Sequence, residues 1–376
     1  MTDAPPTLAP EELGARLQAA RKAAQKTQED AATALGVART TVTAIEKGER
    51  RVQATELLRL AALYSKSLNE LLRPGGATRP LAVQLRASMP RNADDLQELE
   101  PYFAEFQSVA EDYAELEKIC NAPLARRYPA ERSIEGVSAE AMAEDLAQSE
   151  RARLGLGDGP IHRLRDVLER EVGLRIFYLP LPSRISGMFI HDEALGGCIA
   201  ANGNHPPERI RHSLAHEYGH FLTSRGEVSV DFAARYRRVP EGERFAYAFS
   251  PAFLMPESGL KRRFHQVKAD GGGRFSNADL VSLAHYYGVS VESLTRRLED
   301  LRLISRGSWE KLAHAGFRVS EARRLLYLSE DSDDRGLLPQ RYVTLAIAAF
   351  EQGEITEGQF ARFLRVDLIE TRRIRR

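Results

Sequence analysis

The sequence predicts a multidomain protein that is mainly α-helical and carries one small β-sheet. Its 376 residues exceed the length that a single hydrophobic core usually organises, which indicates two or three domains. Apolar residues recur at helical spacing near both ends of the chain. Between residues 161 and 200, short runs of β-branched and aromatic residues lie between glycines, a pattern typical of strands.

The order of these patterns divides the chain into segments. Pro74, Gly75 and Gly76 read as a linker, and a helical pattern with acidic residues follows up to Asn121. A helix at 164–172 and strands at 174–179, 187–190 and 198–200 come next. Five segments are expected: a disordered N-terminus at 1–10, a helical domain at 11–73, a linker and connecting helix at 74–130, an α+β domain at 131–300 and a helical C-terminal region at 301–376.

Composition restricts where the protein acts and what it binds. Lysine plus arginine and aspartate plus glutamate are equal, at 53 each, so nucleic-acid binding must come from a local patch. The two cysteines, Cys120 and Cys198, offer neither a disulfide framework nor a cysteine-based zinc site. The N-terminus lacks the features of an export signal, and no run of about 18 apolar residues occurs. We therefore expect a cytoplasmic protein with no membrane contact.

The segment from Gln28 to Gly48 has the features of two helices that cross at a tight turn. Small apolar residues line the first helix, Gly36 permits the turn, and Val42 and Ile45 bury the second helix against the first. The exposed side chains suit base edges and phosphates of double-stranded DNA. The alternative is a helical bundle that only packs on the rest of the chain. Six residues are the candidate DNA contacts: Gln28, Arg39, Thr40, Thr41, Thr43 and Lys47.

The run from His216 to His220 reads His-Glu-Tyr-Gly-His. On a helix, side chains four residues apart project from one face, so His216 and His220 can bind the same metal ion. Glu217 stands beside the first histidine, where a carboxylate can take a proton from a metal-activated water, as in metalloproteases. Catalytic zinc needs a third protein ligand, and both Glu241 and Glu243 are candidates. The alternative is a structural metal site without catalysis, or a degenerate site that binds no metal.

Other polar and aromatic residues surround this run. His212 is expected to be a polar residue at the helix start or a group that supports the ligands, because a third ligand on the same helix would lie too far along its axis. His205 is expected on a loop surface. Tyr218 and Tyr247 each carry a phenol that suits an oxyanion, yet aromatic residues on helices more often belong to the core. No role follows for either tyrosine.

The N-terminal segment resembles the Xre/Cro/C1 family of repressor helix-turn-helix domains. The resemblance rests on Thr27-Gln28-Glu29, Ala32, Gly36-Val37, Val42, Ile45-Glu46 and Gly48. It implies a five-helix domain that binds an operator as a homodimer. Ala38 departs from the pattern, because the family usually has a serine or threonine there to cap the recognition helix.

The central segment resembles the ImmA/IrrE family of zinc metallopeptidases. The resemblance rests on the strands, on the His216–His220 run, and on Ala246, Phe249 and Phe253-Leu254-Met255-Pro256. It implies a gluzincin-like α+β domain with one Zn²⁺ per chain and Glu243 as the third ligand. Tyr247 replaces the usual asparagine and Ser250 the usual alanine. The resemblance also implies that the helix-glycine-helix segment at 279–298 packs on this domain instead of contacting DNA, and that the remaining helices are a C-terminal extension.

Together these features predict a DNA-binding transcriptional regulator with a zinc metalloendopeptidase domain. The resemblance implies cleavage of a repressor-like transcription factor in response to stress, DNA damage or phage and mobile-element signals, with a nucleic acid as a candidate activator. One alternative is a regulator whose peptidase-like domain is a non-catalytic sensor that controls DNA binding. Another is an antitoxin-like regulator.

Overall fold

The computed structural model describes residues 9–24, 26–64, 71–72, 93–134, 136–226, 228–232, 240–328 and 336–367. Most of the expected disordered N-terminus (1–10) and the linker at Pro74–Gly76 lie outside these residues. The chain divides into two compact units, residues 1–78 and residues 79–376. None of the described helices has the length and hydropathy that crossing a bilayer requires.

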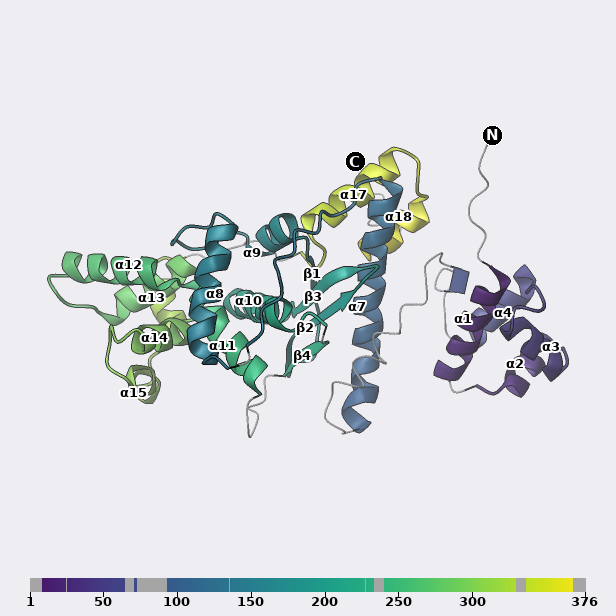
Figure 1. The fold of residues 1–376 in the computed structure, drawn as a ribbon, viewed down its shortest axis with the longest axis horizontal. Helices are drawn as coiled ribbons and strands as arrows, with labels where there is room; N and C mark the ends of the chain where they lie inside the picture. Colours follow the sequence, from purple (N-terminus) through teal and green to yellow (C-terminus); the bar gives the residue numbers. More distant parts are fainter. Residues whose placement is uncertain are drawn as a thin grey trace. The chain divides into compact units, whose positions relative to one another are not determined.

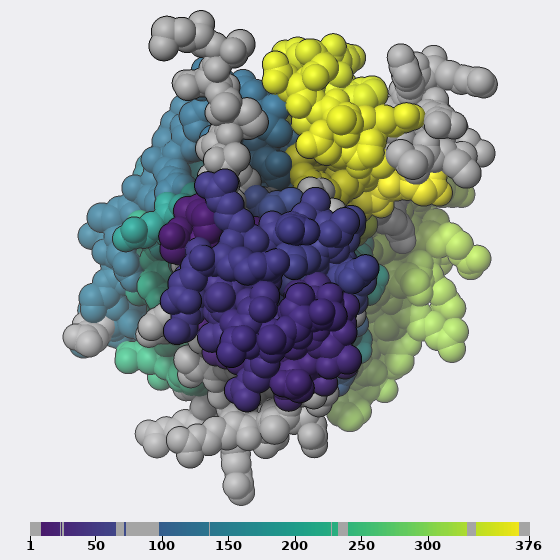
Figure 2. All heavy atoms as spheres, turned by 90° about the vertical axis from the view of Figure 1, so that its right-hand side faces the viewer, coloured from purple at the N-terminus to yellow at the C-terminus, as the bar shows by residue number. Residues whose placement is uncertain are grey.

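The first unit is helical, and its side chains pack into one continuous body (Figure 2). Thr27 and Asp30 form a reciprocal capping box at the start of its second helix, and Gly36 ends that helix in the left-handed conformation at a φ of 73°. Val42 and Ile45 are buried, as predicted. Leu71 and Leu72 are also helical. The complete helices described here are α1 (Pro10–Ala23), α2 (Gln28–Leu35), α3 (Arg39–Glu46) and α4 (Ala54–Leu63).

The second unit is built around a mixed sheet of four short strands, in the order β1-β3-β2-β4. β1 and β3 run parallel, whereas β2 pairs antiparallel with both of its neighbours. The strands predicted at 174–179, 187–190 and 198–200 are confirmed, and β4 is an addition that the sequence pattern did not predict. The strands are β1 (Arg175–Leu179), β2 (Ile185–Asp192), β3 (Gly196–Asn202) and β4 (Ser229–Phe232).

Helices surround this sheet (Figure 1). The predicted connecting helix is present as α7, and the predicted helix at 164–172 begins as α9 and ends in a π-helical turn, η1. Helix α8 was not predicted. The helices are α7 (Ala93–Ile119), α8 (Ala139–Arg153), α9 (Leu164–Val167), η1 (Leu168–Val172), α10 (Pro207–Thr223), α11 (Glu241–Leu254), α12 (Glu257–Asp270), α13 (Asn277–Tyr287), α14 (Val291–Asp300), α15 (Ser308–His314), α16 (Val319–Leu325), α17 (Gln340–Glu351) and α18 (Glu357–Leu364).

The two faces of the sheet belong to two different hydrophobic clusters, because successive strand residues point to opposite faces. Phe189 and Ile199 face α10 and α11. Met188 and Ala200 face α7, α17 and α18 on the other side. The sheet therefore lies between α10, which carries both histidines, and α7 (Figure 1).

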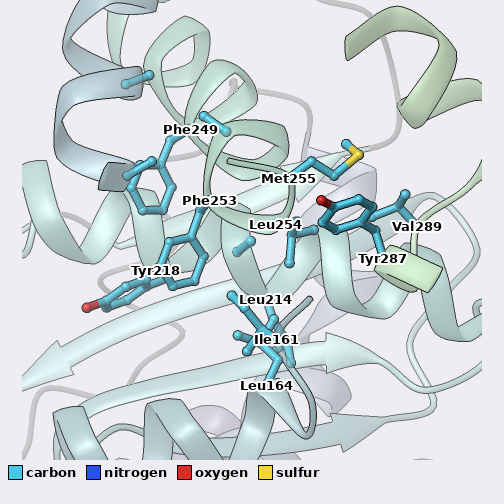
Figure 3. Packing of buried hydrophobic residues seen from close by; sticks show 14 of the residues in the cluster. Ile161, Leu164, Leu214, Tyr218, Phe249, Phe253, Leu254, Met255, Tyr287 and Val289 are labelled. Atoms are coloured by element: carbon cyan, nitrogen blue, oxygen red, sulfur yellow. The ribbon is translucent and has the colours of Figure 1, made fainter. Parts of the chain in front are cut away.

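Aromatic packing joins α10 to α11. The Tyr218 ring of α10 lies 6.0 Å from the Phe249 ring and 5.6 Å from the Phe253 ring, centroid to centroid, and all three side chains are buried (Figure 3). Truncating a buried phenylalanine to alanine typically costs about 3–5 kcal/mol. This contact therefore holds the two helices at a defined separation, and each helix carries residues of the candidate site.

Candidate metal centre and DNA-binding face

Helix α10 presents its two histidines from a buried helical segment. Pro207 occupies its first turn, where a missing N–H costs nothing, and every residue from Ser213 to Leu222 is buried. His216 and His220 lie one turn apart on the same face, so their Nε2 atoms converge to 3.2 Å. A buried imidazole pair of this kind needs polar partners on the facing element.

Helix α11 supplies that partner. Glu243 lies in its first turn, and its carboxylate oxygens lie 3.4 Å from Nε2 of His216 and 3.4 Å from Nε2 of His220. We call His216, His220 and Glu243 the donor cluster, since one ligand atom from each could hold a metal ion. Glu241 is exposed on the same turn and does not belong to the cluster.

The donor spacing fits zinc. Bonds of about 2.0–2.1 Å in a tetrahedral zinc site separate neighbouring ligand atoms by about 3.3 Å. In the donor cluster the two Nε2 atoms lie 3.2 Å apart, close to this separation. Glu243 offers a different oxygen to each histidine, Oε2 at 3.4 Å from His216 and Oε1 at 3.4 Å from His220, and one ligand atom from each of the three residues lies within 4.8 Å of the others. Burial acts to raise the pKa of Glu243, but hydrogen bonds with His216 and His220 outweigh it and leave the pKa below its ordinary value. An ionised carboxylate suits a metal ligand.

Glu217 is fully buried between α10 and the sheet. Its Oε2 accepts a hydrogen bond of 2.7 Å from the Ser229 hydroxyl of β4. Its Oε1 has no hydrogen-bond partner within the described chain and lies against Gly187 of β2, where a Cβ atom would approach it to 2.7 Å. Burial raises the pKa of Glu217 to about 8. The carboxylate thus keeps one oxygen available for a proton or a water molecule.

The remaining sequence candidates occupy different places. His212 stacks on His216 at 6.5 Å between ring centroids, one turn before the donor cluster. His205 hydrogen-bonds the Ser183 carbonyl at 3.2 Å and so belongs to its own loop. Tyr218 donates its hydroxyl hydrogen to the buried Glu150 and lies in the core. Tyr247 is 39% exposed, and its ring centroid lies 4.6 Å from that of His216. Tyr247 is therefore the tyrosine that lies at the site.

Three residues around Glu217 were missed by sequence reasoning. Gly187 and Ser229 contact its carboxylate, and Asp231 of β4 accepts a hydrogen bond of 3.3 Å from the Tyr247 hydroxyl. Ser229 and Asp231 are two residues apart on a strand and so share a face. The alternation in Ser229-Val230-Asp231-Phe232 is the one local signal of this strand, and four residues are too few to identify it.

In the first unit, α3 displays the candidate DNA contacts. Arg39, Thr40 and Lys47 are exposed, and Thr41 and Thr43 are half-buried. Ala38 is the N-cap residue of α3 and provides no side-chain hydrogen bond.

Gln28 is already part of a network in this unit. Its amide donates to Oε2 of Glu46 at 2.9 Å and accepts from the Thr43 hydroxyl at 3.3 Å. The buried Glu46 carboxylate also binds the Arg21 guanidinium at 2.6 Å. The network fixes the side chain of Gln28 at the start of α2.

In the helix-glycine-helix segment α13–α14, the second helix packs against α8 and the end of α11. Val291, Leu294 and Leu298 of α14 are buried, and Arg297 donates to the Met255 carbonyl at 3.2 Å and pairs with Glu144 at 2.8 Å. These contacts bury one face of α14.

Comparisons with known proteins agree with this division of the chain. A helix-turn-helix domain model matches residues 12–72, and the model of the IrrE N-terminal-like domain matches residues 169–299. No curated protein matches the chain. A solved structure, ComR from Streptococcus suis, is 12% identical over 96% of this chain and 94% of that chain, with a TM-score of 0.17, which carries no structural argument. The two domain matches fit a helix-turn-helix regulator fused to an ImmA/IrrE domain, so the chain combines a DNA-binding domain with a metallopeptidase-like domain.

Proposed function

We propose that this protein is a transcriptional regulator that binds a DNA operator as a homodimer and carries a zinc-dependent endopeptidase, with one Zn²⁺ per chain. The observation that carries the enzymatic part is the donor cluster. Its two imidazole Nε2 atoms lie 3.2 Å apart, close to the spacing of about 3.3 Å between neighbouring ligands of tetrahedral zinc, and a different oxygen of the Glu243 carboxylate lies 3.4 Å from each of them. In this proposal His216, His220 and Glu243 hold the ion.

When bound, the ion would lower the pKa of a water molecule and polarise the carbonyl of a peptide bond. Glu217 then acts as the general base, because its Oε1 has no other hydrogen-bond partner among the described residues. After the attack of water, the same carboxylate passes the proton to the leaving amine. Ser229 holds the opposite oxygen, Oε2, and so keeps the carboxylate oriented during both transfers.

For the DNA-binding part we propose that Arg39, Thr40, Thr41 and Thr43 of α3 enter the major groove. Gln28 and Lys47 contact the phosphate backbone from either end of the motif. The exposure of Arg39, Thr40 and Lys47 supports this assignment. Replacing Arg39 with alanine is expected to weaken binding to a DNA fragment from upstream of the protein's own gene by about 10-fold or more, measured by fluorescence anisotropy. Arg318→Ala, in the second unit, is the matched control.

The proposed substrate is a repressor-like transcription factor, and the proposed signals are stress, DNA damage or an invading mobile element, with a nucleic acid as candidate activator. The test incubates purified zinc-loaded protein with helix-turn-helix repressors encoded beside its gene and with casein as a general substrate, each with and without single-stranded DNA. Cleavage products are identified by mass spectrometry.

The matched variant for this test is Glu217→Gln, which preserves the shape of the side chain but removes its basicity. We expect cleavage by the wild-type protein and a loss of at least about 100-fold in the variant, with unchanged zinc content. Intact substrates under every condition, or equal cleavage by both proteins, would contradict the proposed peptidase. If the Glu217→Gln protein contains no zinc, Glu217 contributes to metal binding, which would contradict its assignment as a base outside the ligand set.

A further inference from the structure

Tyr247 differs from the other aromatic residues of α11 in where it points. Phe245, Phe249 and Phe253 are fully buried in the core, whereas Tyr247 is 39% exposed. It lies four residues after Glu243 and therefore on the same helical face as that ligand candidate. Its ring packs on the His216 imidazole at 4.6 Å between centroids. The phenol thus lies beside the donor cluster, and its side chain is partly exposed to solvent.

The hydroxyl of Tyr247 reaches the strand that also supports Glu217. It donates to Oδ1 of Asp231 at 3.3 Å. Asp231 stands directly opposite Gly187 in the β2–β4 ladder, and Gly187 is the residue against which the Glu217 carboxylate packs. The phenol therefore extends from His216 to β4, the strand that also supports the proposed general base. In the proposed peptidase, the phenol borders the space where the substrate carbonyl must lie.

Asp231 is buried where its carboxylate meets the phenol of Tyr247. Only 7% of it is exposed, and its side-chain partner within the described chain is the neutral phenol of Tyr247. A buried polar group is stabilised by the hydrogen bonds that it makes, so this contact ties Asp231 to Tyr247. The hydrogen bond is also longer than the usual 2.7–2.8 Å or so between hydroxyl and oxygen. A tyrosine hydroxyl hydrogen rotates to suit its acceptor, so it can turn to a stronger acceptor that comes within reach while the ring stays in place.

We propose that Tyr247 is a catalytic residue whose hydroxyl donates a hydrogen bond to the oxyanion of the scissile carbonyl, and that Asp231 is the positioning residue that holds this hydroxyl over the site. The inference rests on the proposed peptidase. When the water oxygen bonds to the carbonyl carbon, the electron pair of the C=O π bond moves to the oxygen and the water proton moves to Glu217. Tyr247 donates a hydrogen bond to that oxygen without giving up its proton. The carbon–nitrogen bond then breaks as Glu217 returns the proton to nitrogen.

The first test compares Tyr247→Phe with Tyr286→Phe, since Tyr286 is a similarly exposed tyrosine on α13, at 43%. Loss of one preorganised donor to an oxyanion typically lowers kcat by about 10²–10³-fold. We expect a fall in kcat of about 100-fold in Tyr247→Phe with KM changed by less than about threefold, and wild-type values in Tyr286→Phe. An unchanged kcat in Tyr247→Phe beside an active wild type would overturn the inference and leave the proposed peptidase standing.

The second test does not need a substrate. Cobalt-loaded protein is titrated with acetohydroxamate, a small anionic chelator, and binding is followed by the visible absorbance of cobalt. We expect Tyr247→Phe to weaken acetohydroxamate binding by about 10-fold or more, because hydrogen bonds to charged groups are among the stronger ones, while the affinity for cobalt itself is unchanged. Equal affinities for acetohydroxamate would overturn the inference. If Tyr247→Phe weakens acetohydroxamate binding but the wild-type protein cleaves no substrate, the proposed peptidase is overturned and Tyr247 remains a hydrogen-bond donor to a bound anion.

The role of Asp231 is tested by two substitutions. Asp231→Ala removes the acceptor for the phenol, whereas Asp231→Asn keeps one acceptor oxygen. We expect Asp231→Ala to weaken acetohydroxamate binding as much as Tyr247→Phe does, and Asp231→Asn to keep most of the wild-type affinity. The Tyr247→Phe/Asp231→Ala double variant should bind acetohydroxamate no more weakly than Tyr247→Phe alone. Fully additive losses in the double variant would show that Asp231 acts independently of Tyr247. Thermal unfolding of each variant identifies any that fail to fold.

Discussion

Replacing Gly187 with alanine tests whether the position of the Glu217 carboxylate controls catalysis. A Cβ atom at residue 187 would lie 2.7 Å from Oε1 of Glu217 and 3.1 Å from its Cγ, whereas ordinary van der Waals contact begins at 3.4 Å. The carboxylate must therefore move by about 0.7 Å. Ser229 holds the other oxygen at 2.7 Å, so this movement also strains the hydrogen bond that orients the carboxylate of the proposed base.

The size of the effect follows from this displacement. A misplacement of about 1 Å in a catalytic geometry costs about 100-fold in rate, so a shift of about 0.7 Å predicts a fall in kcat of about 10- to 100-fold. The backbone of Gly187 lies outside the left-handed region, so alanine fits its conformation without strain. Zinc content should remain at one ion per chain, because no atom of the donor cluster is among the close neighbours of the added methyl group.

The assay measures kcat on the peptide that wild-type protein cleaves best, together with zinc content by plasma mass spectrometry and the thermal unfolding midpoint. Gly159→Ala is the matched control, since a Cβ there meets no atom within 4 Å. A Gly187→Ala protein with wild-type kcat would refute the reasoning about the base. Loss of zinc in that protein would show that Gly187 supports the ligands and not the carboxylate.

Three further predictions concern other parts of the chain. Glu243→Gln should weaken zinc affinity by at least about 10-fold in a competitive chelator titration, whereas Glu241→Gln should not, because Glu243 lies beside the two histidines and Glu241 does not. Burial raises the pKa of Glu169 from 4.5 to about 7, so its contribution to stability is complete below pH 4.5 and is lost as the pH rises through 7. In Glu169→Gln the free energy of unfolding should therefore depend less on pH, by up to about 3 kcal/mol, when it is measured by denaturant unfolding between pH 5 and 8. Ala38→Ser should stabilise the first unit by about 1 kcal/mol, measured by calorimetry, because it adds the missing cap to α3.

Each of these three predictions has a contradicting result. Equal zinc affinities in Glu241→Gln and Glu243→Gln would remove Glu243 from the ligand set. An unchanged pH dependence in Glu169→Gln would show that the buried carboxyl, which accepts a hydrogen bond of 2.7 Å from Tyr113, does not titrate in that range. A less stable Ala38→Ser protein would mean that the residue before Arg39 is constrained by something other than capping.

The parts of the site that lie within one helix could be predicted from the sequence. The spacing of His216 and His220 determines which face they share, whatever the rest of the fold does. Glu243 was harder, because Glu241 lies on the same turn and local spacing does not distinguish them; a family resemblance was needed to choose, and the structure brings Glu243 to the histidines. The fold class was predictable for the same reason, since helical periodicity is local.

The contacts made by β4 could not be predicted. Ser229 and Asp231 approach Glu217 and Tyr247 only because β4 pairs with β2, a strand about 40 residues earlier in the chain. No local pattern encodes such a pairing, and each strand residue gains its neighbours through the register of the sheet. Helix α8 was missed for a different reason: its alanine-rich sequence has a weak apolar stripe, although Ser138 caps it as an N-terminal signal predicts.

The position of the sheet has a mechanical consequence for a regulator. One side of β2 carries Gly187, which touches the Glu217 carboxylate, and the opposite side carries Met188, which belongs to the same hydrophobic cluster as α7. Sheet layers are only about 10 Å thick, and protein interiors transmit displacement because they are closely packed. A displacement of β2 would therefore reach the hydrophobic cluster that also contains the buried residues of α7. Helix α7 is also the described helix that follows the DNA-binding unit in the chain.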